Sequence, residues 1–567
     1  MESKQEMIIQ KYQAKFSKLF FCVVATSAAF VGGDKAVQAL TFNFSYEEGT
    51  SIDQIQAFKA AGDVWSSYLT DDVTVNLHVE ITNLLPTNVL GGALPGITDN
   101  QNYGNFENAI YGDRSSTDDY TAYNYMPWDS YDARVNGQWL WNNTEIDLTR
   151  ANSKALGLID AHDTAIDGYI LMSDLSDTST EWHYDLDTPV AADKIDFYSV
   201  AVHEIGHALG FISGVDDTDV YYQSGSSGDD DDDDDDDAGY KTNSATSLDM
   251  FRQSSATTGH GNWDKIDLSV GTNSFFSINN NTNLANFSTG TDTTLGGDGK
   301  QASHWKEQTN VLGIMAPTIG LGERREVTEL DLRAFDVIGW DRSGATQSSV
   351  DFSQLSMNID DEVDDDLASE LGSVQTWMIR GDSLTEEELE TGGGDLDDEE
   401  REKYKAAKDF KEYVEEEEDI NINNVTELSN WVATDQNAKT HLKTWRKTDE
   451  AKETKASKLL NWGKLAQVID MIINSGIYEW GFGGGYGDGC DSDEDNCGNS
   501  QELALYTAQI LTQEGLYNEA YWSTLDVESE AVEVPESDSI TTLLGFGLLG
   551  FAGLVKGKSK NKSISNK

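Results

Sequence analysis

The sequence predicts an α+β fold in which a domain that combines a twisted sheet with helices precedes a mainly helical, acidic C-terminal region. Two observations lead to this prediction. In residues 40–342, some segments alternate apolar and polar residues as strands do, and others space apolar residues as helices do. In residues 343–532, charged residues are frequent and helical stretches such as LDDEEREKYKAAKDFKEYVEEEED occur. Strands and helices mixed within one stretch of chain are typical of the α+β class.

Strand and helix patterns alternate along the first domain. Strands are expected at Thr41–Tyr46 and Val73–Ile81, and a helix between them at Ser51–Leu69. A polar, aromatic-rich stretch follows, then an amphipathic segment around Trp139–Leu156 and a third strand at Asp167–Asp174. The next segment, KIDFYSVAVHEIGHALGFIS, is predicted to be an apolar helix with a glycine near its end.

The charge of the chain limits its partners. A formal net charge of −62 argues against nucleic acid and against anionic membrane surfaces. Within an inserted, polar segment at residues 214–299, nine consecutive aspartates occupy Asp229–Asp237. A block of like charge this dense is expected to be a solvated loop, with calcium binding as the alternative. The composition suits an exported protein.

Residues 1–39 have the pattern of a signal peptide. Four lysines precede the apolar run LFFCVVATSAAFVGG, and Val37 and Ala39 form a small-residue cleavage signal. Cleavage after Ala39 would leave Cys490 and Cys497 as the remaining cysteines. Export would permit these two residues to pair as a disulfide.

Residues 533–567 carry a second targeting pattern. A Val-Pro-Glu start is followed by an apolar stretch, Ile540–Val555, and then by five lysines. This order resembles the PEP-CTERM sorting signal of exported bacterial proteins. The resemblance implies that export and C-terminal sorting machinery recognise the tail at the membrane and remove it, so that membrane contact is transient. It also implies a final location in the cell envelope, at the cell surface or in the extracellular matrix. An ordinary tail anchor is the alternative.

The stretch HEIGHALGFISGVDD carries the clearest chemical pattern in the chain. His203 and His207 lie four residues apart and share one face of the predicted helix, so both imidazoles can reach one metal ion. Glu204 lies on the adjoining side, where its carboxylate can act as a base. A hydrolytic zinc site normally has three protein ligands. In the commonest extended form of this motif the third is a histidine six residues after the second, and here that position is Ser213.

Three candidates for the third ligand remain. His304 is favoured because the turn GIMAP, which contains Met315, follows it. Asp216 or Asp217 could ligate instead, although their offset is too long for the usual aspartate position. His260 lies in the inserted segment and has no methionine turn after it.

The ordered set HEIGHALGF, a long insertion, HW, IMAP and a final helix ending in Gly-Trp resembles the leishmanolysin branch of the metzincin zinc proteases. The resemblance implies an endopeptidase with one catalytic zinc ion and a peptide or protein substrate. It implies His203, His207 and His304 as ligands, with Glu204 as general base. It also implies that Gly210 permits the turn after the helix and that Met315 forms the floor of the site. Three neutral imidazoles would leave zinc doubly positive and able to acidify a bound water.

A separate acidic segment, DSDEDNCGNSQE, is a candidate calcium loop. Asp491, Asp493, Asp495 and Glu502 occupy ligand positions of an EF-hand-like loop. The glycine expected in the middle of such a loop is replaced by Asn496. The alternative is a solvated loop closed by the candidate disulfide.

Two further hypotheses stay open on the sequence alone. The strand at Gly168–Ser173 is a candidate edge for pairing with an extended peptide substrate, and an interior strand is the alternative. The rival to an enzyme is a non-enzymatic, metal-stabilised surface or matrix protein, which the presence of Glu204 disfavours because a structural metal site needs no base.

Overall fold

The structure, a computed structural model, describes residues 40–460 and 523–527, with gaps inside the first range. The gaps are residues 48, 84, 86–88, 177, 217, 219, 224–238, 259–264, 309–310, 344–349, 419, 449–450 and 452–454. The predicted signal peptide, sorting tail, aspartate run, calcium loop and disulfide all lie outside the described residues. Among the helices that are described, none has the length and apolar character needed to cross a bilayer.

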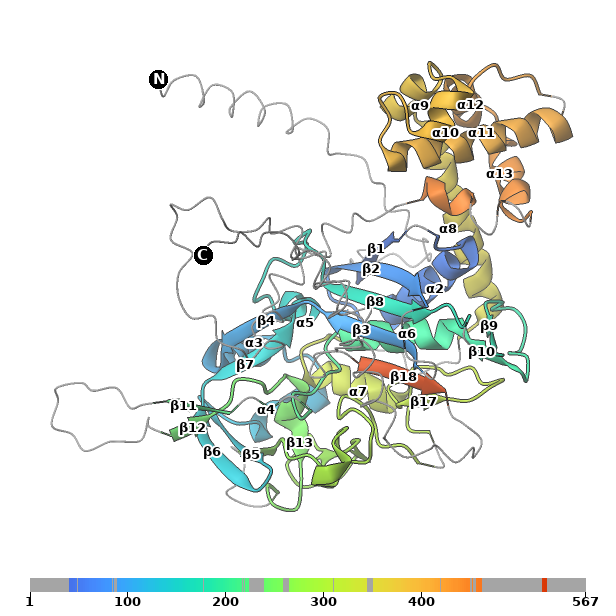
Figure 1. Ribbon diagram of the computed structural model, residues 1–567. Helices are drawn as coiled ribbons and strands as arrows, with labels where there is room; N and C mark the ends of the chain where they lie inside the picture. The colour runs from blue at the N-terminus through green and yellow to red at the C-terminus, as the bar shows by residue number, and fades with distance from the viewer. Residues whose placement is uncertain are drawn as a thin grey trace, which may run out of the picture. The chain divides into compact units, whose positions relative to one another are not determined.

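The main sheet has six strands in the order β1-β2-β8-β3-β18-β17 (Figure 1). Their bounds are β1 Thr41–Tyr46, β2 Thr74–Thr82, β8 Gly168–Ser173, β3 Val89–Pro95, β18 Ser523–Val527 and β17 Thr318–Ile319. The first three pair in parallel, and β3 is antiparallel to β8. Strand β18 is antiparallel to β3 and parallel to β17. The sheet therefore brings a segment from near the C-terminus beside a strand from the first hundred residues.

Two helices, α2 (Ile52–Tyr68) and α6 (Phe197–Ala208), pack against each other and against this sheet. Helix α2 begins at Ser51, whose side chain and that of Gln54 form a reciprocal capping box. The indole nitrogen of Trp65 donates to the carbonyl of Val202 at 2.9 Å. This bond fixes α6 against α2 in the core, where every residue of α6 is buried.

Most of the elements predicted for residues 40–342 are present, with two corrections. The predicted helix KIDFYSVAVHEIGHALGFIS is helical only over α6, because its first three residues form strand β10 (Lys194–Asp196) and the helix ends at Ala208. The segment around Trp139–Leu156 is not one amphipathic unit, because it divides into β6 (Gln138–Asn143), β7 (Glu145–Thr149) and the short helix α5 (Arg150–Ala155). Strand β6 pairs with β5 (Tyr131–Val135), and β7 pairs with β4 (Ile97–Asn102). The pairing of β6 is a local hairpin across Asn136–Gly137, whereas β7 pairs with a strand more than 40 residues earlier, and these pairings override the local spacing of apolar residues.

The stretch between β2 and β6, for which the sequence predicts no element, is also folded. It contains β3, β4 (Ile97–Asn102), α3 (Tyr103–Asp113), α4 (Thr117–Tyr125) and β5 (Tyr131–Val135). Strand β3 has the sequence VLGGALP, and its two glycines weaken any strand pattern. Its place in the sheet comes from pairing with β8 and β18.

The inserted segment is built from short elements packed on the domain. These are β11 (Tyr221–Gln223), β12 (Gly239–Lys241), η2 (Leu248–Phe251), β13 (Arg252–Gln253), β14 (Lys265–Asp267), β15 (Phe275–Phe276), β16 (Ala285–Asn286) and η3 (Thr293–Leu295). Arg252 is fully buried and pairs with Asp249 at 3.2 Å. Its guanidinium also lies over the ring of Phe287 at 4.2 Å. The buried apolar residues of the insertion, such as Phe251 and Phe276, belong to the same core cluster as those of α6 and the main sheet.

Two strands before α6 and one helix after the insertion complete the elements of residues 40–342. They are β9 (Glu181–His183), β10 (Lys194–Asp196) and α7 (Glu329–Val337). Helix α7 starts with a capping box between Thr328 and Asp331. Trp340, beyond its end, is fully buried and donates to the carbonyl of Leu209 at 2.9 Å.

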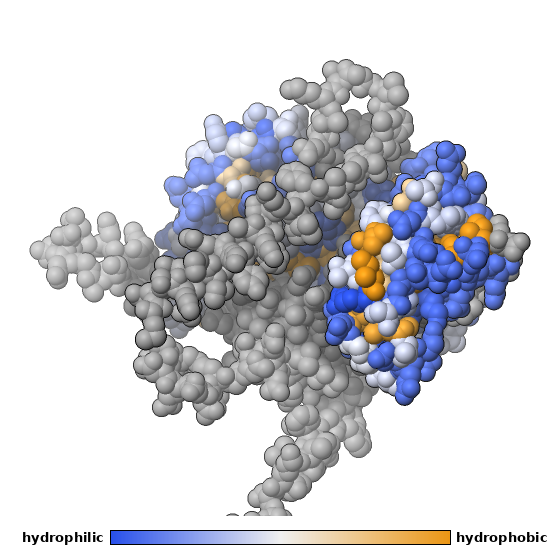
Figure 2. Space-filling model, turned by 90° about the horizontal axis from the view of Figure 1, so that it is seen from above, coloured by the Kyte–Doolittle hydropathy of each residue, from blue (hydrophilic) through white to orange (hydrophobic). Residues whose placement is uncertain are grey.

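The region after residue 350 is mainly helical, which confirms the predicted α+β class with a helical C-terminal part. Its elements are α8 (Phe352–Gly372), α9 (Thr376–Gly381), α10 (Glu386–Thr391), α11 (Asp398–Glu418), α12 (Val425–Thr434), α13 (Ala438–Arg446) and η4 (Ala456–Leu459). Buried Arg446 pairs with Asp364 at 2.5 Å and with Asp360 at 2.9 Å. Lys59 of α2 pairs with Glu362 of α8 at 2.5 Å. Figure 2 shows that the coloured surface in this view is mostly hydrophilic, with small separate hydrophobic patches.

Candidate metal centre

Helix α6 positions the two histidines of the HEIGH motif. It begins at Asp196, whose carboxylate accepts from the backbone N–H of Ser199 at 3.2 Å. It ends near Gly210, which has a φ of +120° and whose N–H donates to the carbonyl of His207 at 3.0 Å. A side chain at Gly210 would be strained in this conformation, so glycine lets the chain turn away directly after the motif.

The turn at Gly210 also provides a hydrogen-bond acceptor for the imidazole of His207. It brings the carbonyl of Phe211 to 2.7 Å from Nδ1 of His207. On the preceding turn of the helix, Nδ1 of His203 lies 2.7 Å from the carbonyl of Ile314. Each Nδ1–H can therefore donate to a backbone carbonyl, and this hydrogen bond fixes the orientation of the ring.

The third imidazole comes from His304, 97 positions after His207 in the sequence. Its carbonyl accepts from the N–H of Ser288 at 3.0 Å, and its Nδ1 lies 3.2 Å from the carbonyl of Gln301. Next to it, Ser303 Oγ accepts from the N–H of Ser213 at 3.0 Å. The segment before His304 is thus attached directly to the chain that leaves α6.

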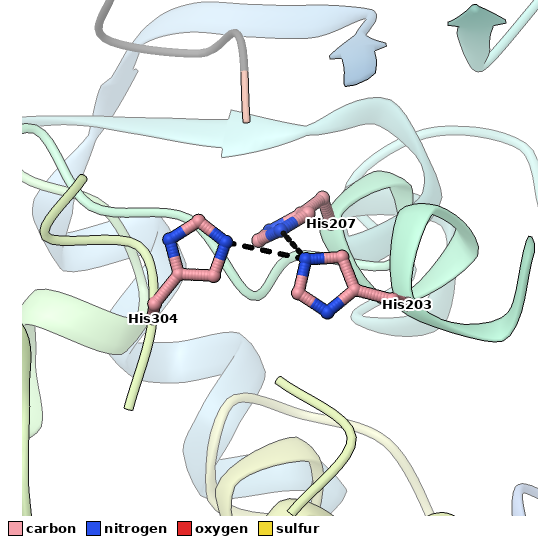
Figure 3. Close-up of side chains that lie close together, drawn as sticks. All are labelled: His203, His207 and His304. Carbon is pink, nitrogen blue, oxygen red and sulfur yellow. Dashed lines mark hydrogen bonds between the residues drawn. The ribbon is translucent and has the colours of Figure 1, made fainter. Parts of the chain in front are cut away.

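The three imidazoles face one another (Figure 3). The Nε2 atom of His203 lies 2.9 Å from Nε2 of His207 and 3.2 Å from Nε2 of His304. All three rings are buried, and they form a group that could hold a metal ion. With each Nδ1–H donated to a carbonyl, the Nε2 atoms carry lone pairs that point at a common position.

This donor set fits zinc. Tetrahedral zinc with Zn–N bonds of about 2.0–2.1 Å separates its nitrogen ligands by about 3.3 Å, close to the separations found here. Burial is the main cause that lowers the pKa of each imidazole, and it lowers the pKa of His304 to about 3. The rings therefore stay neutral at neutral pH, which is the form that binds metal.

Glu204 lies on α6 between the two histidines and is fully buried. Its carboxylate faces strand β3, since a Cβ added at Gly91 would lie 2.8 Å from Oε1 of Glu204. The same added carbon would lie 3.0 Å from Val200 of α6. Glycine at position 91 therefore allows β3 to approach the carboxylate closely.

Met315 lies against the side of α6 that carries the motif. A Cβ added at Gly206 would lie 2.5 Å from Sδ of Met315, so the thioether contacts the helix between the two histidines. The carbonyl of Met315 accepts from the N–H of Trp305 at 2.9 Å. The methionine turn and the segment that carries His304 are therefore hydrogen-bonded neighbours.

The structure shows other contacts for Ser213, which occupies the usual position of the third ligand, and for Asp216, one of the alternative ligands. Ser213 donates its hydroxyl to Asp249 at 2.6 Å. Asp216 accepts from the N–H of Ala302 and from that of Thr291, both at 2.6 Å. Among the described residues, Asp216 belongs to neither of the two groups that could hold a metal ion. Asp217 and His260 lie outside the described residues.

The second of these groups consists of Asp71, Asp113 and Asp341, which are half-buried. Burial, with the charge of the other two carboxylates, raises the pKa of Asp71 to about 8. Burial, with the charges of Asp341 and Asp119, raises the pKa of Asp113 to about 7. The three carboxylates thus repel one another when ionised.

Two residues beside the histidine cluster were missed by sequence reasoning. Asp331 is fully buried and accepts from the indole nitrogen of Trp305 at 2.8 Å and from the N–H of Ile314 at 2.9 Å. Its spacing from Thr328 is that of a capping box, so the pattern T-x-x-D marks it as a helix start. Gly91 lies in a stretch for which no strand is predicted.

The strand predicted as a candidate edge for an extended peptide substrate is β8. In the structure β8 is an interior strand between β2 and β3, so this prediction is wrong.

Comparison of the chain with models of protein families, with curated proteins and with solved structures finds no match.

Proposed function

We propose that the protein is an exported zinc-dependent endopeptidase. The observation that carries the proposal is the convergence of three buried imidazoles beside the buried carboxylate of Glu204 on the same helix. The histidines supply neutral nitrogen ligands, and the carboxylate is the group that a hydrolytic reaction needs as a base. The order of motifs along the chain, which resembles the leishmanolysin branch of the metzincins, points to the same activity.

In the proposed reaction, His203, His207 and His304 hold the zinc ion. When bound, zinc supplies a Lewis acid that makes water more acidic and polarises the carbonyl of the scissile peptide bond. Glu204 accepts the proton of the attacking water and delivers it to the leaving amine. Burial of Glu204 beside β3 keeps this proton transfer within a site from which most water is excluded.

The proposed substrates are peptides or proteins outside the cytoplasm. The pattern of residues 1–39 supports export, and the pattern of residues 533–567 supports recognition by C-terminal sorting machinery. The net charge of −62 disfavours nucleic acid as a partner. We infer a location in the cell envelope, at the cell surface or in the extracellular matrix.

A site that only stabilises the fold is the competing interpretation. Structural zinc sites are usually closed by four protein ligands, whereas catalytic sites keep one position open. Within the described residues the group has three members, His203, His207 and His304. A buried carboxylate beside a group of three ligands favours hydrolysis over a structural role.

The decisive experiment replaces Glu204 and leaves the ligands intact. Glu204→Gln is expected to retain about one zinc ion per chain, as the three-imidazole set implies, and to lower casein hydrolysis by about 10²–10⁴-fold. Glu181→Gln, at an exposed carboxylate of β9, is the matched control and keeps both properties. Near-normal hydrolysis by Glu204→Gln would overturn the assignment of the base. Absence of zinc-dependent hydrolysis both in the unsubstituted chain and in a chain whose segment Ser523–Val527 is displaced, tested on a proteome-wide peptide mixture, would favour the structural role.

A further inference from the structure

Strand β18 lies in the sheet next to the candidate active site. Ser523–Val527 inserts between β3 and β17, antiparallel to β3 (Figure 1). Within the pairing, Leu525 is opposite Gly91, and Ser523 is opposite Ala93. A segment from near the C-terminus thus covers the hydrogen-bonding edge that β3 presents away from β8.

The edge of β3 is suited to an extended peptide. Strand β3 pairs with β8 on one side and with β18 on the other. Without β18 its outer N–H and C=O groups would form an open row. Such a row accepts an added strand through backbone hydrogen bonds, which is a recurring mode of peptide recognition.

The edge also runs past the candidate catalytic base. Gly91 is the residue of β3 whose missing side chain leaves room for the Glu204 carboxylate, with 2.8 Å from an added Cβ to Oε1. Helix α6, which carries His203 and His207, packs against both β3 and β18. A strand added at Gly91 therefore places its backbone beside the histidine cluster, where a peptide bond must lie to be hydrolysed.

We propose that Ser523–Val527 is an internal occupant of the peptide-binding edge and holds the site closed to substrate. This inference rests on the proposed function and names its substrate as an extended peptide that adds antiparallel to β3. One edge offers one row of hydrogen-bonding groups, so β18 and a substrate exclude each other. Displacement of β18 opens the site.

The pairing of β18 with β3 contains one irregularity. Leu525 is opposite Gly91 and the next residue, Asp526, is opposite Val89, so Leu90 of β3 is an extra residue in the ladder. An extra residue of this kind bends the strand that carries it, which here is β3. The bend lies beside Gly91, the position nearest the base, and belongs to the edge itself.

The test uses the full chain with proline in β18, because proline removes a backbone donor and is not accepted inside a sheet. Consecutive residues of a strand direct their N–H groups to opposite neighbours, so Thr524→Pro and Leu525→Pro are combined in one variant. Ala531→Pro, four residues beyond the strand, is the matched control. Unchanged zinc content and circular dichroism show that the variants remain folded.

Three measurements are compared, and two of them do not depend on catalysis. Hydrogen exchange of the β3 amides is expected to be at least about tenfold faster in the double variant than in the control. A labelled peptide spanning residues 520–530 is expected to bind the double variant and not the unsubstituted chain, measured in the Glu204→Gln background to prevent cleavage. Casein hydrolysis is expected to increase in the double variant.

The outcomes separate this inference from the proposed function. Unchanged exchange of β3 together with no binding of the peptide would overturn the internal occupant, whatever the rate of hydrolysis. Faster exchange and peptide binding without hydrolysis in any variant would support occupancy of the edge and overturn the peptidase assignment.

Discussion

The indole nitrogen of Trp305 donates a hydrogen bond to the carboxylate of Asp331 at 2.8 Å. The same carboxylate accepts from the N–H of Ile314 at 2.9 Å and caps the start of α7. One buried side chain therefore connects the residue after His304, the methionine turn and a helix. Its contacts make Asp331 a positioning residue for the histidine cluster.

Replacing Asp331 should loosen the cluster without removing a ligand. Asp331→Asn turns one acceptor oxygen into a donor that faces other donors. Zinc affinity is expected to fall by about 10–100-fold, as for other lost supporting contacts. The free energy of unfolding is expected to fall by about 1–3 kcal/mol. Chelator competition and thermal unfolding measure the two effects. Glu329→Gln, on the same turn of α7, is the control and should change neither the zinc affinity nor the free energy of unfolding. Equal losses in the two variants would show that Asp331 is not a positioning residue for the cluster.

Removing the third imidazole should have a larger effect. His304→Ala is expected to weaken zinc binding by more than about a hundredfold, beyond the range of a lost supporting contact, and to abolish hydrolysis. His162→Ala, at an exposed histidine, is the control. Zinc analysis after dialysis against a weak chelator checks the result. Full zinc retention by His304→Ala, together with loss of zinc from His260→Ala or Asp216→Ala, would show that His260 or Asp216 is the third ligand instead of His304.

The close packing of Gly206 against Met315 can be tested by a double-mutant cycle. Gly206→Ala would place a carbon 2.5 Å from Sδ of Met315 and should destabilise the fold by about 1–3 kcal/mol. Met315→Ala removes the clash, so the double variant should lose at least about 1 kcal/mol less than the sum of the single variants. Gly112→Ala, where the added carbon meets nothing within 4 Å, is the control. Additive losses in urea unfolding would show that the two residues do not interact.

The acidic group of Asp71, Asp113 and Asp341 predicts a pH dependence of stability. Because the folded protein raises the pKa of Asp71 to about 8 and of Asp113 to about 7, it binds more protons than the unfolded chain between their ordinary values and these values. The contribution of the group to stability is therefore greatest at acidic pH and falls as the pH rises toward about 8.

Asp113→Asn should remove part of this dependence. The variant is expected to unfold a few degrees above the unsubstituted protein near pH 8, because one like charge is absent, and to show little difference near pH 4. Thermal unfolding of both proteins across this range measures the difference. A constant difference at every pH would mean that charge repulsion is not its cause.

The sequence by itself determined the position of those helices and strands that depend on residues close together in the chain. Strands β1, β2 and β8 and helices α2, α6 and α7 lie within about five residues of the ends expected from hydrophobic periodicity, capping residues and glycine. His203, Glu204 and His207 share a helix, so their spacing alone places the two imidazoles on one face. Local patterns suffice for such features because the backbone geometry of a helix or strand repeats.

The tertiary structure decided what depends on segments far apart in the sequence. The pairing of β3 with β18 joins residues more than 400 positions apart, and the two glycines of β3 give little sign of a strand. The approach of His304 to His203 depends on buried groups such as Asp331 and Arg252, whose partners come from separate segments. These contacts depend on burial and on hydrogen bonds that form only in the folded chain. The local periodicity of the sequence therefore does not predict them.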